Sequence, residues 1–187
     1  MNVEIKSALI RVLPFAISLI VLFFATKKRK IEIDNFYLKT PSTINRFLFS
    51  VIGFIVFILV TEFSLYQFGI LEIDKWRHSL YPSIIRVLGA VVLAPIAEEL
   101  IFRGLILTKL IKKNLNIHFA ILIQACFFVL LHNFTYQNSL LANIGIAQSL
   151  IDATLFGYAR QFTKSIYTPI TMHITGNFIA ILERFIL

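Results

Sequence analysis

Apolar residues in this chain are gathered into long blocks that are separated by short polar segments. The blocks approach the ~20 residues that an α-helix needs to cross the hydrocarbon core of a bilayer. We therefore predict an all-α fold, a polytopic transmembrane helix bundle with about six membrane helices. The expected helices are Ala8 to Thr26, Phe47 to Phe68, Ser83 to Leu110, Ile117 to His132, Leu140 to Phe162 and Ile166 to Phe185.

The composition indicates that the chain folds in a lipid bilayer and not in water. Of the 187 residues, 58% are hydrophobic and 15% are charged, and 19 are phenylalanine. An ordinary soluble domain has roughly 25% charged residues. Because a soluble chain of this composition would expose large apolar patches to water, we expect a multi-pass integral protein of the cell membrane, with the lipid bilayer as its surroundings.

The first apolar block, Val12 to Ala25, is expected to be a retained membrane span. Lys6 and Arg11 precede it and a run of four basic residues follows it, without a pattern of small residues at its end. A cleaved signal peptide would carry such a cleavage pattern.

The formal net charge of +8 arises from basic residues at the ends of the apolar blocks. Three basic segments fall on the same side of the expected bundle: Lys27 to Arg46, Lys109 to Lys113, and Arg160 to Lys164. The connections on the opposite side are balanced in charge or uncharged. The positive-inside rule makes the basic side cytoplasmic and places both termini outside. We interpret the charge as a topology signal and expect no nucleic-acid partner.

Ionisable residues lie deep inside three of the expected helices. Charged groups at this depth are costly and are by default functional or paired. With a rise of ~1.5 Å per residue from the cytoplasmic ends, Glu98, His132 and His173 lie roughly 18, 22 and 14 Å deep. All three depths fall within the middle of a ~30 Å hydrocarbon layer. A site in the core of a helix bundle requires groups from several helices at one depth, as here.

The spacing of the polar residues separates their expected roles. Glu99 and Arg103 are four residues apart and can form a charge pair on one helix face. Glu98 lies about 100° around the helix from Glu99 and points elsewhere, where it is available for chemistry. His173 and Asn177 are also four apart and can present a ring nitrogen and an amide to one ligand atom.

At these residues the sequence resembles the CPBP family, the CAAX protease and bacteriocin-processing membrane proteins, also called the Abi family. The motifs of that family are Glu-Glu-x-x-x-Arg, Phe-x-x-x-His and His-x-x-x-Asn or Asp. They read here Glu98-Glu99-x-x-x-Arg103, Phe128-x-x-x-His132 and His173-x-x-x-Asn177.

The resemblance begins at about Pro82 and continues to the C-terminus. We therefore divide the chain into residues 1–80, two N-terminal membrane helices with a basic cytoplasmic loop, and residues 81–187, the catalytic core. The resemblance implies an intramembrane endopeptidase of the type II CAAX prenyl endopeptidase kind. Its substrate would be a membrane-associated peptide or protein, either a CAAX-type tail or a bacteriocin or leader peptide.

The resemblance also implies a role for each motif residue. Glu98 would act as general base on a water molecule that His132 helps to hold. His173 and Asn177 would donate hydrogen bonds to the oxyanion. Glu99 and Arg103 would fix the geometry of the helix. The family pattern leaves the two glutamates interchangeable, and we favour Glu98 as the base because Glu99 has Arg103 on its face.

A zinc site is the alternative interpretation of the same residues. Glu98, His132 and His173 can supply three ligands and leave an open position for water. We favour a metal-free glutamate mechanism without a cofactor, because an asparagine such as Asn177 is a poor zinc ligand. Cys126 is the single cysteine, which excludes an internal disulfide and a thiol-rich metal site.

The same side chains can also have simpler roles. The charges can form a buried ion cluster that holds helices together, and the histidines can be interhelical hydrogen-bonding groups. Phe128 is expected to pack, because a phenyl ring transfers no protons. Asp152 is expected to find a partner on a neighbouring helix.

Two further function classes compete with the peptidase. A non-proteolytic bacteriocin immunity or membrane scaffold protein of the same family would keep the fold without using the site for catalysis. A transporter would use Glu98 and Asp152 as a proton relay, but the sequence lacks the inverted repeat typical of transporters. Motifs of the zinc site-two, rhomboid and aspartyl intramembrane proteases are also lacking.

Overall fold

The computed structural model describes residues 2–71, 73–132 and 139–186, apart from the side chain of His132. Every regular element in these ranges is helical, as predicted. The elements are α1 (Val3–Lys27), η1 (Ile33–Phe36), α2 (Ile44–Gln67), α3 (Leu80–Leu88), η2 (Gly89–Leu93), α4 (Ala94–Glu99), η3 (Leu100–Ile106), α5 (Leu107–Lys112), α6 (Ile117–His132), α7 (Leu140–Thr163) and α8 (Tyr167–Ile186).

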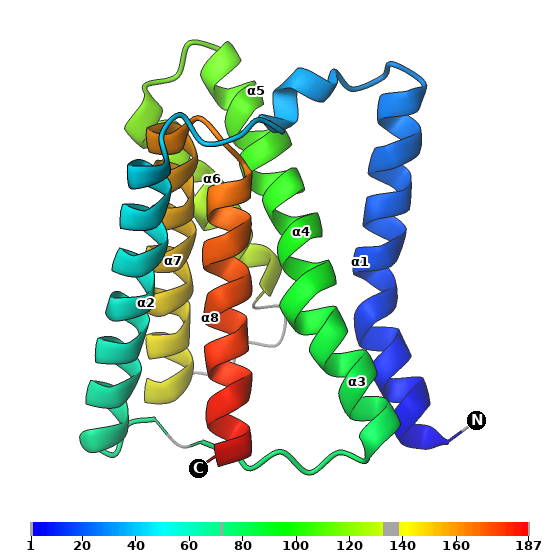
Figure 1. Cartoon of the computed structure of the whole chain (residues 1–187), viewed down its shortest axis with the longest axis vertical. Helices are drawn as coiled ribbons and strands as arrows, with labels where there is room; N and C mark the ends of the chain where they lie inside the picture. The colour runs from blue at the N-terminus through cyan, green and yellow to red at the C-terminus, as the bar shows by residue number, and fades with distance from the viewer. Residues whose placement is uncertain (1, 72, 133–138, 187) are drawn as a thin grey trace.

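The six predicted membrane helices are all present. The third is the continuous rod from α3 to α5, in which two π-helical turns, η2 and η3, interrupt the α-helix (Figure 1). A 3₁₀ turn, η1, was not predicted. The uncharged connection at 133–138 lies outside the described residues.

Local capping explains where several helices begin. The Thr43 side chain accepts a hydrogen bond from the Arg46 amide at the start of α2, and Asn2 does the same for Glu4 at the start of α1. These side chains satisfy amides that have no partner within the helix. The cap at Asn2 explains why α1 begins five residues before the predicted Ala8, since apolar character alone had set that boundary.

Three helices, α1, α2 and α7, are long and apolar enough to cross a membrane. Their large apolar side chains face outward to an extent that water would not support: Phe49 is 74% exposed and Phe23 is 62% exposed. Such an exposed apolar surface is suited to lipid. The fold is therefore that of a membrane helix bundle.

The basic segments gather at one end of the bundle, and both termini lie at the other (Figure 1). Contacts across the connections at the basic end support this arrangement: Lys112 forms an ion pair with Glu32 at 3.0 Å, and the Ile166 amide donates to the Tyr37 carbonyl at 3.0 Å. The prediction that these segments share one side is confirmed.

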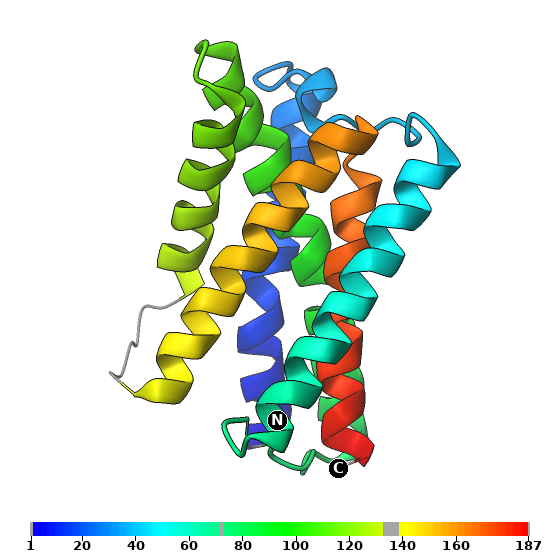
Figure 2. The ribbon, with the colours of Figure 1, turned by 90° about the vertical axis from the view of Figure 1, so that its left-hand side faces the viewer.

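The view in Figure 2 shows α6, α7 and α2 crossing the bundle as neighbouring rods. Close contact between α6 and α7 depends on Gly157, where a Cβ atom would lie 2.8 Å from Cγ2 of Ile121. Small residues permit such approach between membrane helices. Gly157 thus allows α7 to pack closely against α6, the helix that ends at the candidate residue His132.

Candidate active site

Glu98 and Glu99 lie in α4, a short α-helical segment between the two π turns. π turns inside α-helices occur frequently at functional sites. Glu99 is completely buried, whereas Glu98 is 8% exposed and lines a cavity. Adjacent glutamates therefore have different surroundings, as their angular separation on a helix predicts.

Arg103 compensates the buried charge of Glu99. Its Nη1 donates to Glu99 Oε1 at 2.8 Å, which confirms the pair predicted from their spacing. Its Nη2 donates to the carbonyl of Ala153 in α7 at 2.9 Å. The guanidinium also lies between two aromatic rings, 4.9 Å from the centroid of Phe128 and 5.1 Å from that of Phe156. These contacts make a fully buried arginine tolerable.

His173 in α8 connects the two glutamates. A carboxylate paired with Arg103 can only accept hydrogen bonds, so His173 Nδ1–H donates to Glu99 Oε1, at 2.9 Å. The other ring nitrogen, Nε2, then faces Glu98 Oε2 at 3.7 Å. The ring stacks on Phe156, with centroids 5.1 Å apart. Glu99 and Phe156 therefore fix the orientation of the His173 ring, and its Nε2 is directed toward Glu98.

Asn177 lines the same cavity, and a backbone irregularity determines its partner. In the π turn η2 the Ala94 amide donates to the Gly89 carbonyl. The next amide would serve the Ala90 carbonyl, but residue 95 is proline and has none. Asn177 Nδ2 donates to this carbonyl at 2.8 Å. Because an amide nitrogen has two hydrogens, one donor of Asn177 is committed to the helix.

The third motif residue, His132, ends α6, and its side chain lies outside the described part of the structure. Its position relative to Glu98 stays a prediction. Phe128, one turn earlier, is 6% exposed and contacts both the Arg103 guanidinium and the His173 ring. These contacts agree with the packing role expected for Phe128, which also lines the cavity of the site.

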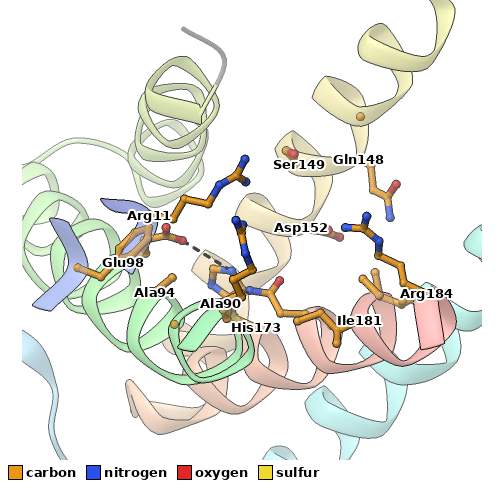
Figure 3. Close-up of a pocket in the computed structure, with 18 of the residues that line it drawn as sticks. Arg11, Ala90, Ala94, Glu98, Gln148, Ser149, Asp152, His173, Ile181 and Arg184 are labelled. Atoms are coloured by element: carbon orange, nitrogen blue, oxygen red, sulfur yellow. Dashed lines mark hydrogen bonds and ion pairs between the residues drawn. The ribbon is translucent and has the colours of Figure 1, made fainter. Parts of the chain in front are cut away.

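A cavity of about 880 Å³ contains Glu98, His173 and Asn177 on its wall. Figure 3 shows Arg11, Asp152 and Arg184 among the residues around this cavity. Nε of Arg184 donates to the Asp74 carbonyl of the connection between α2 and α3 at 3.0 Å. Charged side chains from six elements line it: Arg11, Glu62, Arg86, Glu98, Asp152 and Arg184.

Glu62 and Arg86 also line the cavity, and Arg86 Nη2 donates to Ser7 Oγ of α1 at 3.0 Å. Asp152 was expected to have a partner on another helix, yet its Oδ1 is buried without a hydrogen-bond partner.

Sequence reasoning missed Gln124 and Phe156. Gln124 is fully buried and donates to the Ala153 carbonyl at 3.0 Å, the same carbonyl that Arg103 contacts. It lies one turn before Phe128 on the same helix face, which is a signal that the sequence contains. Phe156 lies one turn after Asp152, but its apolar character makes it indistinguishable from lipid-facing phenylalanines.

The donor set for a metal is incomplete among the described side chains, which contain no group of three His, Cys, Asp or Glu residues arranged to hold an ion. Glu98 and His173 face one another at a separation that two ligands of one ion can have. The third ligand of the zinc alternative, His132, is not described. The chemistry of Glu98 and His173 therefore fits either a water molecule or a metal.

Comparison with known proteins gives one family. The family described as type II CAAX prenyl endopeptidase Rce1-like matches residues 80–179, more than half of the 187 residues. The matched range contains all six candidate site residues. The chain matches no curated protein and no solved structure.

Proposed function

Because this chain belongs to the type II CAAX prenyl endopeptidase Rce1-like family of membrane-embedded proteases, we propose that it hydrolyses a peptide bond with Glu98 as general base. It acts as a multi-pass protein of the cell membrane on a membrane-associated peptide or protein. The substrate is either a CAAX-type tail or a bacteriocin or leader peptide.

The observation that carries this proposal is the division of labour between the two glutamates. Both contacts of Glu99 Oε1 are internal, to Arg103 at 2.8 Å and to His173 at 2.9 Å. Glu98 instead lines the cavity and faces His173 Nε2. Of the two carboxylates, Glu98 is therefore the one that can reach a substrate water.

The proposed reaction balances as a simple hydrolysis. Glu98 removes a proton from water while the water oxygen attacks the scissile carbonyl carbon. The second amide hydrogen of Asn177 donates to the oxyanion of the tetrahedral intermediate. His173, whose Nδ1–H already donates to Glu99, donates to the same oxyanion from Nε2 as the doubly protonated imidazolium. Glu98 then returns the proton to the leaving amine as the carbon–nitrogen bond breaks. We assign His132 the holding of the attacking water.

Glu99 and Arg103 position these groups and do not touch the substrate. Arg103 bridges Glu99 to the Ala153 carbonyl of α7, and Glu99 fixes the His173 ring of α8. The same arrangement would serve a zinc ion, which would be held by Glu98, His173 and His132 and would polarise the carbonyl and its bound water. We favour the metal-free reaction because Asn177, the fourth group at the site, is an amide and a poor zinc ligand.

The proposal is tested by comparing the peptides in membranes that carry the wild-type chain and the Glu98→Gln variant. The change replaces one oxygen by nitrogen and removes the basic carboxylate while keeping its size. Glu32→Gln is the matched control, since Glu32 forms an exposed ion pair at the far end of the bundle.

We expect cleavage products with the wild type and Glu32→Gln that are lost with Glu98→Gln, at equal amounts of membrane protein. An unchanged peptide profile with Glu98→Gln would contradict the proposal and favour an immunity or scaffold role.

A further inference from the structure

The cavity that contains Glu98 extends toward one end of the bundle. Its lining comes from residues 11–15 of α1, 54–62 of α2, 145–156 of α7 and 173–184 of α8. α1 and α7 run away from the end that carries the termini, and α2 and α8 run toward it (Figure 1). These ranges therefore share the half of the bundle that contains both termini.

The end of the cavity is marked by residues of the connection between α2 and α3. Trp76 and His78 belong to this connection and line the cavity. Arg11, Arg86 and Arg184 also line it. Because guanidinium groups are costly in hydrocarbon, a cavity with three of them is hydrated. Water therefore reaches Glu98 and His173 from the end that carries the termini.

The opposite end of the bundle is closed by buried side chains. Leu107, Ile121 and Ile166 are completely buried there. Arg160 is 1% exposed, lies 3.7 Å over the Tyr37 ring and donates to the Thr108 hydroxyl.

The connection that follows α1 is part of the same closure. Thr108 donates to the Asn35 carbonyl at 2.9 Å, which ties this connection to the rod of α3 to α5. Among the described residues that line the cavity, none comes from the basic connections. The site is thus shut off from the basic end.

The charges of the connections assign the two ends to sides of the membrane. The segment Lys27 to Arg46 has six basic and two acidic residues, whereas residues 68–79 have two of each. The positive-inside rule makes the basic, closed end cytoplasmic and the open end extracytoplasmic.

Resting on the proposed function, we propose that the substrate enters the site from the extracytoplasmic face. The substrate is then a polypeptide segment presented at the outer surface of the membrane, such as the leader of an exported peptide, and not the tail of a cytoplasmic protein. The cavity delivers this segment past Arg11 and Arg184 to Glu98 in the middle of the bundle.

Three single-cysteine variants in a Cys126→Ser background test this proposal by labelling. Ser42→Cys reports on the basic end, Ser79→Cys on the end that carries the termini, and Ser149→Cys on the cavity (Figure 3). Each change is from serine to cysteine, so the three variants are matched. A charged, membrane-impermeant maleimide is applied to right-side-out and to inverted vesicles, with detergent-unfolded protein as the reference for complete labelling.

We expect Ser79→Cys and Ser149→Cys to be labelled in right-side-out vesicles and to lose labelling in inverted ones. Ser42→Cys shows the reverse. The proposal is overturned if Ser149→Cys is labelled only in inverted vesicles or in neither preparation, because the cavity would then not open outward. It is equally overturned if Ser79→Cys is labelled only in inverted vesicles, because the orientation would then be wrong.

Labelling needs no peptidase activity. A catalytically inert chain would therefore give the same pattern, and the failure of this proposal is distinguishable from a negative result with Glu98→Gln.

Discussion

Arg103 carries a positive charge at a position without any exposure to solvent. Glu99, the Ala153 carbonyl and two aromatic rings stabilise this buried charge. These groups belong to α4, α6 and α7. A charge that is compensated by several elements constrains all of them to one arrangement. Arg103 thus links α4 to α7 through Glu99 and the Ala153 carbonyl.

Replacing Arg103 by methionine removes this compensation and leaves Glu99 as a buried charge. We expect a loss of about 3–5 kcal/mol in the free energy of unfolding, as for other buried pairs that lose one partner. Unfolding in detergent would measure it. The double variant Arg103→Met with Glu99→Gln should lose less than Arg103→Met alone, because no uncompensated carboxylate remains. An equal or greater loss in the double variant would contradict the charge argument.

Contacts within one helix were predictable, whereas most side-chain contacts between helices were not. The Glu99–Arg103 pair follows from a spacing of four residues. The stacking of Phe156 on His173 depends on how α7 packs against α8, for which the sequence has no local signal. The role of Arg11 in the cavity likewise depends on where α1 packs.

At the scale of elements, the six membrane helices were predictable because each is an apolar block of sufficient length. The π turns were not, because one extra residue per turn leaves no mark on hydrophobicity. Pro95 was the available signal, since it removes an amide and leaves a carbonyl to be satisfied. In the structure, Asn177 satisfies the Ala90 carbonyl, so the irregular element and the site residue are coupled.

The close approach of α6 and α7 should be sensitive to the size of residue 157. In Gly157→Ala the new Cβ would lie 2.8 Å from Ile121 Cγ2 and 3.2 Å from Gln124 Nε2. We expect a destabilisation of about 1–3 kcal/mol from overpacking, visible as a lower melting temperature in detergent.

Gly145 of the same helix provides the matched control, because a Cβ there meets nothing within 4 Å. Gly145→Ala should leave the melting temperature unchanged or raise it. Equal destabilisation by both substitutions would contradict the packing argument.

At the scale of the whole molecule, the pattern of charge along the chain predicted that the basic connections lie at one end of the bundle. The structure confirms this prediction. The cavity did not follow from the sequence. It is formed by residues of α1 and α2 together with the family core, and no motif covers these two helices.

The metal-free mechanism makes a prediction about the intact protein in its membrane. Dialysis against a zinc chelator should leave the rate of substrate cleavage unchanged, and elemental analysis should find zinc well below one ion per chain. Loss of activity with the chelator, followed by rescue with zinc, would instead assign Glu98 and His173 as metal ligands.

The most direct test of the central claim is the rate at which the purified chain in liposomes cleaves a peptide identified in the membranes. Glu98→Gln should lower this rate by about 10²- to 10⁴-fold, the contribution typical of a general base, with the melting temperature of the protein preserved. A Glu98→Gln variant that cleaves at the wild-type rate would contradict the assignment of Glu98 as the catalytic base.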